Sequence, residues 1–285
     1  MSRSGIIVLD KPEGLTSQQA VGRVRRALGI KHVGHGGTLD PMATGVLPIF
    51  VGRATRASGM LLDADKAYRA GFVCGIRTDT QDTTGEVISR CETLPSPKEV
   101  EAVLKHFVGR QQQVPPMYSA IKINGKKLYE LARKGEEVER KAREIEIFSI
   151  EYHGFENGEH VIDVSCSKGT YIRTLIDDIG TQLGCGAAMS SLRRTRTGRF
   201  TLKDAVSLDA LSADTPLLPT DSLWIDLPAV TVDPKREERI RHGGPVFADI
   251  PDGEVRVFSE DGEFLMLGRA EGRVLSSVKN FFEVD

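Results

Sequence analysis

Short apolar segments with strand-like and helix-like spacing are interspersed along this chain, without the regular alternation that builds a doubly wound parallel sheet. Continuous or alternating apolar residues predict strands at 6–9, 68–76, 144–152 and 160–166. Apolar residues at helical spacing predict helices at 17–28, 97–108 and 172–183. The mixture predicts an α+β fold, and 285 residues suffice for one large domain and one small one.

A stretch with several prolines and no periodicity marks the expected domain boundary, which we place near Asp226. Beyond it, Asp233 and Pro234 open a short basic helix. The dipeptide Asp-Gly at 261–262 separates two apolar runs and predicts a hairpin. Residues 1–225 are therefore expected to form the main domain, and residues 226–285 a small β-rich module.

The apolar runs and the cysteines indicate in which cellular compartment the protein is expected to lie. The longest unbroken apolar stretch, 46–51, is far too short to span a bilayer. Four scattered cysteines form no C-x-x-C pair, which argues against a zinc site and favours a reducing compartment. We therefore expect a cytoplasmic protein without a targeting or membrane segment.

Basic residues are segregated along the chain although the formal net charge is only −2. Residues 14–39 contain four Lys or Arg and no acidic residue, and residues 122–143 contain eight against four glutamates. Four further arginines lie between Arg193 and Arg199. Each segment alone fits a solvated surface, but three segments of one sign favour a surface that binds nucleic-acid phosphates.

The segment 34–41 is the strongest candidate for a reactive site. Its three glycines let the backbone approach a ligand closely, and Pro41 keeps the preceding Asp40 in an extended conformation. A carboxylate held in this way fits a nucleophile or a general base. A simple Asp-Pro turn, in which the carboxylate bonds to local amides, fits the same residues.

Short motifs in a fixed order identify a family. They read LDKP at 9–12, GHGGTLDPMATG at 34–45, PPMYSAIK at 115–122, SKGTYIRTL at 167–175 and LRRT at 192–195. From Gly5 to about Phe200 they resemble the TruB-type tRNA pseudouridine-55 synthases of the stand-alone bacterial type. This resemblance implies a mixed, largely antiparallel central sheet flanked by helices, with a PUA-like module at 226–285. One departure is Gly36, where the family usually has threonine or serine.

The resemblance also implies the reaction and its central residues. Asp40 corresponds to the family's catalytic aspartate, and Arg173 to the arginine that pairs with it. Pseudouridine formation breaks the C1′–N1 bond of uridine and rejoins the uracil through C5. Because the uracil keeps all of its atoms, we expect no cofactor and no metal.

Four other residues correspond to positions around the reacting nucleotide. Tyr68 matches an aromatic residue that packs against a flipped uracil, although its place in an alternating strand equally fits a core residue. Tyr171 and Leu192 match positions that line the pocket, and Leu192 also fits the core. His35 matches a histidine that helps to hold the flipped nucleotide, and a proton-transfer role for it is not expected.

A last set is expected to support the reactive loop or to contact RNA. Residues of about 111–145 resemble the family's RNA-gripping insertion, and the tail resembles an RNA-binding module. The candidates are Lys11, Pro12, Lys122, Lys126, Lys127, Arg193 and Arg194. The expected partner is the T stem-loop of tRNA, bound by a monomer that does not associate with a membrane.

Two other functions fit parts of the same pattern. One is a guide-RNA-dependent pseudouridine synthase subunit, a class that usually carries longer terminal extensions. The other is a tRNA-folding chaperone in which catalysis is secondary. Residues 42–45 and the basic insertion look more like the stand-alone type than the guide-dependent one. Intact Asp40 and Arg173 argue against an inactive protein, although they are compatible with added chaperone activity.

Overall fold

The computed structural model describes residues 3–119, 121–123, 125–132 and 134–283. The chain forms two compact units, and both are assembled from separate stretches of sequence. The first unit contains Met1–Asp40, Leu47–Leu62 and Lys203–Asp285, and the second contains Pro41–Val46 and Asp63–Leu202. Strand β3 (Thr44–Val51) begins in the second unit and continues into the first.

The first unit is built on buried strand β1, whose Ile6, Val8 and Leu9 are almost completely shielded from solvent. Strand β1 pairs in parallel with β14, and β2 pairs antiparallel with β3. Helix α1 begins at a Thr16 capping box and ends at Gly29, whose φ of 66° is left-handed, as the sequence predicts. The bounds are β1 (Gly5–Lys11), α1 (Ser17–Leu28), β2 (Val33–His35) and β14 (Ala205–Ser207).

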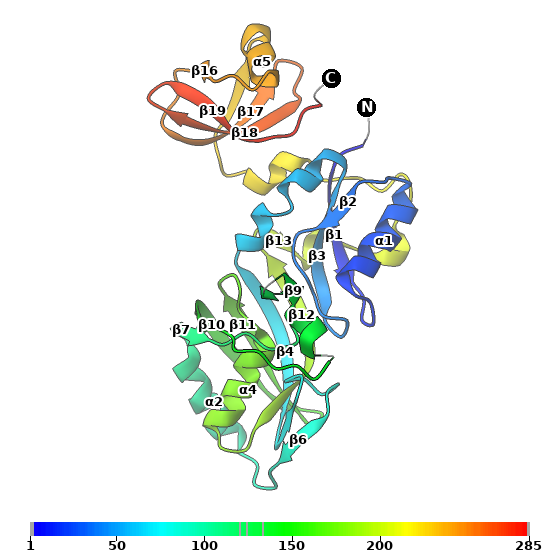
Figure 1. The fold of residues 1–285 in the computed structure, drawn as a ribbon, viewed down its shortest axis with the longest axis vertical. Helices are drawn as coiled ribbons and strands as arrows, with labels where there is room; N and C mark the ends of the chain where they lie inside the picture. Colours follow the sequence, from blue (N-terminus) through cyan, green and yellow to red (C-terminus); the bar gives the residue numbers. More distant parts are fainter. Residues whose placement is uncertain (1–2, 120, 124, 133, 284–285) are drawn as a thin grey trace. The chain divides into compact units, whose positions relative to one another are not determined.

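The C-terminal part of this unit is a five-stranded sheet in the order β15-β17-β18-β19-β16 (Figure 1). The predicted hairpin is present as β17 and β18, and Asp233 caps the predicted helix α5. Their core includes Val257, Leu265 and Phe282. The bounds are β15 (Ala229–Val232), α5 (Pro234–Arg241), β16 (Val246–Phe247), β17 (Gly253–Ser259), β18 (Phe264–Glu271) and β19 (Val274–Asn280).

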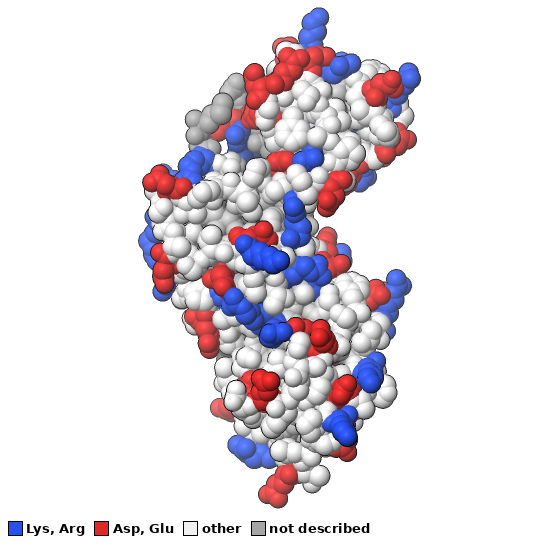
Figure 2. All heavy atoms as spheres, turned by 180° about the vertical axis from the view of Figure 1, so that it is seen from behind, with Lys and Arg blue, Asp and Glu red and all other residues white. Residues whose placement is uncertain are grey.

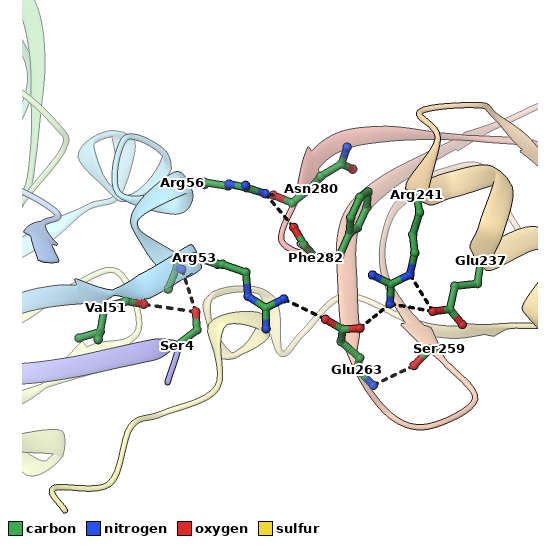
Figure 3. Close-up of polar contacts among 11 residues, drawn as sticks. Ser4, Val51, Arg53, Arg56, Glu237, Arg241, Ser259, Glu263, Asn280 and Phe282 are labelled. Carbon is green, nitrogen blue, oxygen red and sulfur yellow. Dashed lines mark hydrogen bonds and ion pairs between the residues drawn. The ribbon is translucent and has the colours of Figure 1, made fainter. Parts of the chain in front are cut away.

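Two arginines of the 3-10 helix η1 (Gly52–Ala57) contact this C-terminal sheet. Arg53 Nη1 lies 3.1 Å from Glu263 Oε1, and the other oxygen of Glu263 pairs with Arg241 of α5 (Figure 3). Arg56 donates hydrogen bonds to the carbonyl oxygens of Asn280 and Phe282. Glu263 therefore joins a helix of the module to a segment about two hundred residues earlier in the chain.

The second unit has a sheet in the order β12-β4-β11-β10-β7, and the first residues of β3 pair in parallel with β12. The other ladders described for these strands of the second unit are antiparallel, with β13 paired to the end of β12. The bounds are β4 (Lys66–Cys74), β7 (Gly109–Gln113), β10 (Arg143–Glu156), β11 (Glu159–Cys166), β12 (Ala187–Thr197) and β13 (Phe200–Thr201).

Helices and short hairpins complete the second unit (Figure 1). They are β5 (Ile76–Thr78), β6 (Val87–Arg90), α2 (Pro97–Leu104), β8 (Lys122–Ile123), β9 (Lys126–Lys127), α3 (Leu128–Ala132) and α4 (Ile172–Gln182). Across both units, the other 3-10 helices of the described residues are η2 (Met60–Asp63), η3 (Lys105–Phe107), η4 (Leu202–Asp204), η5 (Leu208–Ala210) and η6 (Thr220–Trp224).

This architecture confirms the predicted fold class, a mixed, largely antiparallel sheet with few helices and a β-rich C-terminal part. Sequence patterning did not predict β12, because the run of arginines at 193–199 hides its strand character. The predicted helix at 97–108 is shorter, since η3 follows α2 after Leu104. Within the described ranges, no helix has the length and apolar character needed to cross a bilayer.

Candidate active site

The backbone before Asp40 is anchored to helix α1. The Leu39 amide donates to Ser17 Oγ at 2.8 Å, and Ser17 Oγ donates to the Leu39 carbonyl oxygen at 3.0 Å. Leu39 and Ser17 are both buried, whereas Asp40 is only half-buried. The chain is thus fixed immediately before a carboxylate that remains partly accessible, which is the arrangement a reactive side chain requires.

The structure gives a physical reason for Gly36, which departs from the family pattern. Its amide donates to the Pro48 carbonyl oxygen at 2.9 Å, and this holds the loop against β3. A Cβ at this position would lie 2.7 Å from the Phe50 ring and 3.0 Å from Leu61. Because real Cβ atoms do not approach other atoms as closely as 2.7 Å, a threonine or serine would require the Phe50 ring to move and Leu61 to adjust slightly.

His35 is held within its own loop. It lies on β2, and its Nδ1 accepts a hydrogen bond from the Gly37 amide at 3.4 Å. The ring is therefore oriented by the same glycine-rich segment that leads to Asp40. This contact fits a positioning role for His35.

In the second unit, Tyr68 and Leu192 lie on one face of the β4–β12 ladder. Leu192 pairs with Ala70, and Arg194 pairs with Tyr68, so that Leu192, Arg194 and Tyr68 point to the same side. Tyr68 is 9% exposed, and Leu192 is only partly buried. The partial exposure of Leu192 differs from the core position that its sequence pattern favoured.

Arg194 is almost completely buried beside Tyr68. Its Nε donates to the Val46 carbonyl oxygen at 2.8 Å, and its guanidinium is hydrogen-bonded to the Tyr68 phenol. Burial lowers the pKa of Arg194, while the Tyr68 phenol acts in the opposite direction. Burial also lowers the pKa of the nearby Lys66, with a further contribution from Arg194. Of the two roles expected for Arg194, burial favours the structural one over direct RNA contact.

Tyr171 is the N-cap residue of α4 and is fixed by Gln113 of β7. The Tyr171 amide donates to Gln113 Oε1 at 2.8 Å, and Gln113 Nε2 donates to the Tyr171 carbonyl oxygen at 3.1 Å. The Arg143 guanidinium lies 5.2 Å from the centre of the Tyr171 ring, within cation–π range. The start of α4 is therefore tied to the edge strand of the sheet.

Arg173 follows in the first turn of α4 and is buried. Its two terminal nitrogens donate to the carbonyl oxygens of Thr80 and Tyr118, each at 2.8 Å. Asp82 Oδ2 lies 3.7 Å from Arg173 Nη1, and both side chains are less than a tenth exposed. A buried guanidinium with these contacts is not the solvent-facing helix residue that composition alone would favour.

Asp82 is a functional candidate that the sequence patterns did not identify. It lies in the polar turn after β5, where an aspartate is ordinary, and the only available signal was the density of Thr and Asp at 78–84. Its burial and its proximity to Arg173 become apparent only in the folded chain.

The remaining candidates differ in accessibility. Lys11 is fully buried, and its ammonium donates to the carbonyl oxygens of Pro12 and Leu15 at 2.8 and 2.7 Å, which favours the structural role. Arg193 is partly buried and donates to Thr44 Oγ1 at 3.4 Å. The side chains of Lys122, Lys126 and Lys127 lie outside the part of the chain that the structure describes.

One group in the described residues has the composition of a metal site. Ligand atoms of Glu151, His153 and Asp163 lie within 4.8 Å of one another. The Arg69 guanidinium bonds to both oxygens of Asp163, at 2.8 and 2.7 Å, and therefore already neutralises this carboxylate. Because Arg69 and Tyr68 are consecutive in β4, the group lies on the other face of the sheet from Tyr68.

Comparison with known proteins places these residues in a family context. The TruB family pseudouridylate synthase N-terminal domain matches residues 25–172. The tRNA pseudouridylate synthase B C-terminal domain matches 173–221, and the pseudouridine synthase II TruB C-terminal domain matches 228–276.

Individual relatives extend this similarity over nearly the whole chain. A tRNA pseudouridine synthase B from Methylobacillus flagellatus is 44% identical over 94% of this chain and 92% of its own length. The Pseudomonas syringae protein of the same name is also 44% identical, over 95% of this chain and 93% of its own. In an H/ACA RNP bound to a substrate RNA containing 2′-deoxyuridine, one chain is 27% identical and superposes with a TM-score of 0.72, covering 99% of this chain and 86% of that one.

Proposed function

Since this chain belongs to the TruB family of pseudouridylate synthases, we propose that it isomerises uridine 55 in the T loop of tRNA, with Asp40 as the catalytic carboxylate. The observation that supports this proposal most strongly is the 44% sequence identity, over 94% of the chain, to a tRNA pseudouridine synthase B. The anchoring of Leu39 by Ser17 supports the assignment of Asp40, because it fixes the backbone and leaves the carboxylate partly accessible.

The reaction is an isomerisation, so its balance needs no second substrate. The C1′–N1 bond breaks, a C1′–C5 bond forms, the proton leaves C5, and N1 gains a proton. The Asp40 carboxylate either attacks the sugar at C1′ or assists removal of a proton from it. Both routes use an ionised carboxylate, which aspartate provides at neutral pH.

Arg173 is proposed to keep the Asp40 carboxylate charged and oriented. A guanidinium presents two donors in one plane, which suits a carboxylate better than an ammonium does. The contacts to Thr80, Tyr118 and Asp82 restrict the Arg173 side chain to one orientation. Asp82 also offsets the cost of burying a cation.

Tyr68 and Leu192 are proposed to receive the flipped uracil. Chemistry at C1′ and C5 requires the nucleotide to leave the base stack, and an aromatic face recovers part of the stacking energy. The shared orientation of Tyr68 and Leu192 and the partial exposure of Leu192 support this placement.

RNA binding is proposed to involve the basic segments and the C-terminal module, taken as a PUA-like domain of residues 226–285. We propose that the enzyme acts as a monomer in the cytoplasm, without a guide RNA. The solved relative in an H/ACA RNP supports the alternative of a guide-RNA-dependent subunit. The higher identity to tRNA pseudouridine synthase B supports the stand-alone enzyme.

The decisive test is incubation of the purified protein with an unmodified tRNA transcript and no other RNA, followed by mapping of pseudouridine. We expect one new pseudouridine at position 55 and none in a transcript with cytidine there. Activity should persist after chelation of metals, once the transcript has been folded. A folded protein that leaves the transcript unmodified, or that requires a guide RNA, would refute the proposal.

A further inference from the structure

The turn between β5 and β6 carries two of the contacts made by Arg173. Thr80 supplies a carbonyl oxygen, and Asp82 supplies a nearby carboxylate. Asp82 Oδ1 accepts hydrogen bonds from Thr80 Oγ1 at 2.8 Å, from the Thr84 amide at 3.0 Å and from Thr84 Oγ1 at 2.5 Å. The turn is therefore closed around Asp82, and its position determines where the Arg173 guanidinium lies.

Gln81 lies between these two contacts in an uncommon conformation. Its φ of 64° is in the left-handed region, which non-glycine residues occupy at some energetic cost. Its carbonyl oxygen accepts a bond from the Met189 amide at 3.1 Å, and the Thr83 amide donates to the Met189 carbonyl oxygen at 2.8 Å. Strand β12 thus holds the backbone at Gln81 and at Thr83, on either side of Asp82.

The Gln81 side chain connects the turn to α4. Thr174 Oγ1 donates to Gln81 Oε1 at 2.9 Å, and Gln81 Nε2 donates to Asp177 Oδ2 at 3.4 Å. Arg77 holds both oxygens of Asp177, each at 2.8 Å. Thr174 and Asp177 are buried on the helix that carries Arg173, and Thr174 is the next residue in sequence.

We propose that Gln81 and Thr174 are positioning residues for Arg173, because their side-chain hydrogen bond sets the spacing between the turn and helix α4. The inference rests on the proposed role of Arg173 in pseudouridine formation. Without this bond, the turn can move relative to α4, and the Thr80 carbonyl and Asp82 carboxylate move with it. Arg173 then occupies several orientations, only some of which serve catalysis.

The test compares substitutions that keep side-chain shape. Thr174→Val removes the hydroxyl and keeps the volume, while Thr174→Ser keeps the hydroxyl. Gln81→Met removes the amide and keeps the length. Thr181→Val is the matched control, since Thr181 Oγ1 donates to the Asp177 carbonyl oxygen of the same helix at 2.8 Å.

We expect Thr174→Val to lower kcat by about three- to tenfold, the effect of removing one hydrogen bond, with KM unchanged. Gln81→Met should lower kcat by at least as much, because it also removes the bond from Gln81 Nε2 to Asp177. Thr174→Ser and Thr181→Val should retain kcat within about twofold. In an Arg173→Lys background, Thr174→Val should have almost no further effect, because the group that it positions is absent. Melting temperatures identify any variant that loses activity through unfolding.

The outcomes separate this inference from the proposed function. If Arg173→Lys is impaired while Thr174→Val and Gln81→Met match Thr181→Val in kcat, the positioning role is refuted and the function stands. The positioning role would also be refuted if Thr174→Val lowered kcat by the same factor in the wild-type protein and in the Arg173→Lys variant. If the wild-type protein forms no pseudouridine in tRNA, the proposed function fails and the inference fails with it.

Discussion

Charged side chains are held differently around helix α4 and in the C-terminal module. Arg173 and Asp82 are buried, and backbone groups of several segments fix them. In the module, Arg269 pairs with Glu254 and Arg273 with Asp249, and these arginine side chains are 52% and 75% exposed. Burying charges is costly, whereas exposed pairs contribute little to stability. In our proposal, Arg173 and Asp82 are buried despite this cost because Arg173 serves the reaction.

The two basic helices of the first unit show a related contrast. Arg23 and Arg26 of α1 are exposed, and no ion pair involves them among the described residues. In α5, Arg236 pairs with Asp233, and Arg241 with Glu237 and Glu263. On the face of the molecule that Figure 2 shows, acidic side chains lie beside many of the basic ones. Basic residues in the sequence therefore overstate the positive surface available for phosphates in the module.

Among the substitutions that test these two contrasts, Arg173→Lys is expected to have the largest effect. An ammonium cannot reproduce the contacts to Thr80 and Tyr118 while also serving a carboxylate. We expect kcat to fall on the order of a hundredfold, with tRNA affinity preserved. Single-turnover kinetics with saturating enzyme would measure the decrease. Near-normal turnover would remove the functional reason for burying this cation.

Tyr68→Leu comes next. The substitution removes an aromatic face and the phenol that is bonded to buried Arg194, and it keeps an apolar side chain at this position of β4. Loss of stacking is expected to cost about 1–3 kcal/mol of transition-state stabilisation, roughly a five- to hundredfold drop in kcat. Thermal unfolding is the control, because a sharp fall in Tm with normal turnover would make Tyr68 a core residue.

A smaller effect should distinguish the two basic helices. We expect Arg23→Gln/Arg26→Gln to weaken tRNA binding and to reduce the slope of log K against log salt by roughly 0.7 to 0.9 for each RNA phosphate that the protein no longer neutralises. The matched double variant Arg236→Gln/Arg239→Gln should change the slope less, since Arg236 is already paired. Affinity measured across a salt series gives both slopes. A larger change from the α5 variant would reverse the contrast.

The smallest effect is expected from Arg269→Ala in the module. The Arg269–Glu254 pair is exposed, and such pairs contribute about 1 kcal/mol or less. Equilibrium unfolding in urea should therefore give nearly the same midpoint as the wild type. A destabilisation of several kcal/mol would show that exposed pairs hold this module together after all.

The sequence predicted the elements whose signals are local. The Thr16 and Ser96 capping boxes, the left-handed Gly29 and the Asp-Gly hairpin all depend on neighbouring residues and appear as expected. Strand β12 was missed because its neighbours β3 and β4 bury Arg194, which periodicity treats as a surface residue.

The candidate site was predictable to a similar degree. The motifs pointed to Asp40 and Arg173 as candidates, and the family resemblance added Tyr68. Asp82 and Gln81 come from a polar turn that resembles any loop. Their importance depends on contacts with α4, about ninety residues away in the chain. Long-range contacts of this kind produce no periodic pattern in the sequence from which they could be predicted.

The proposed role of Asp40 as the catalytic carboxylate underlies the other proposed roles, and Asp40→Asn tests it most sharply because the change is nearly isosteric. Pseudouridine formation in unmodified tRNA should be measured in single turnover, with tRNA affinity determined for the same preparation. We expect no detectable product and unchanged affinity. Measurable turnover by pure, folded Asp40→Asn would contradict the catalytic role of this carboxylate.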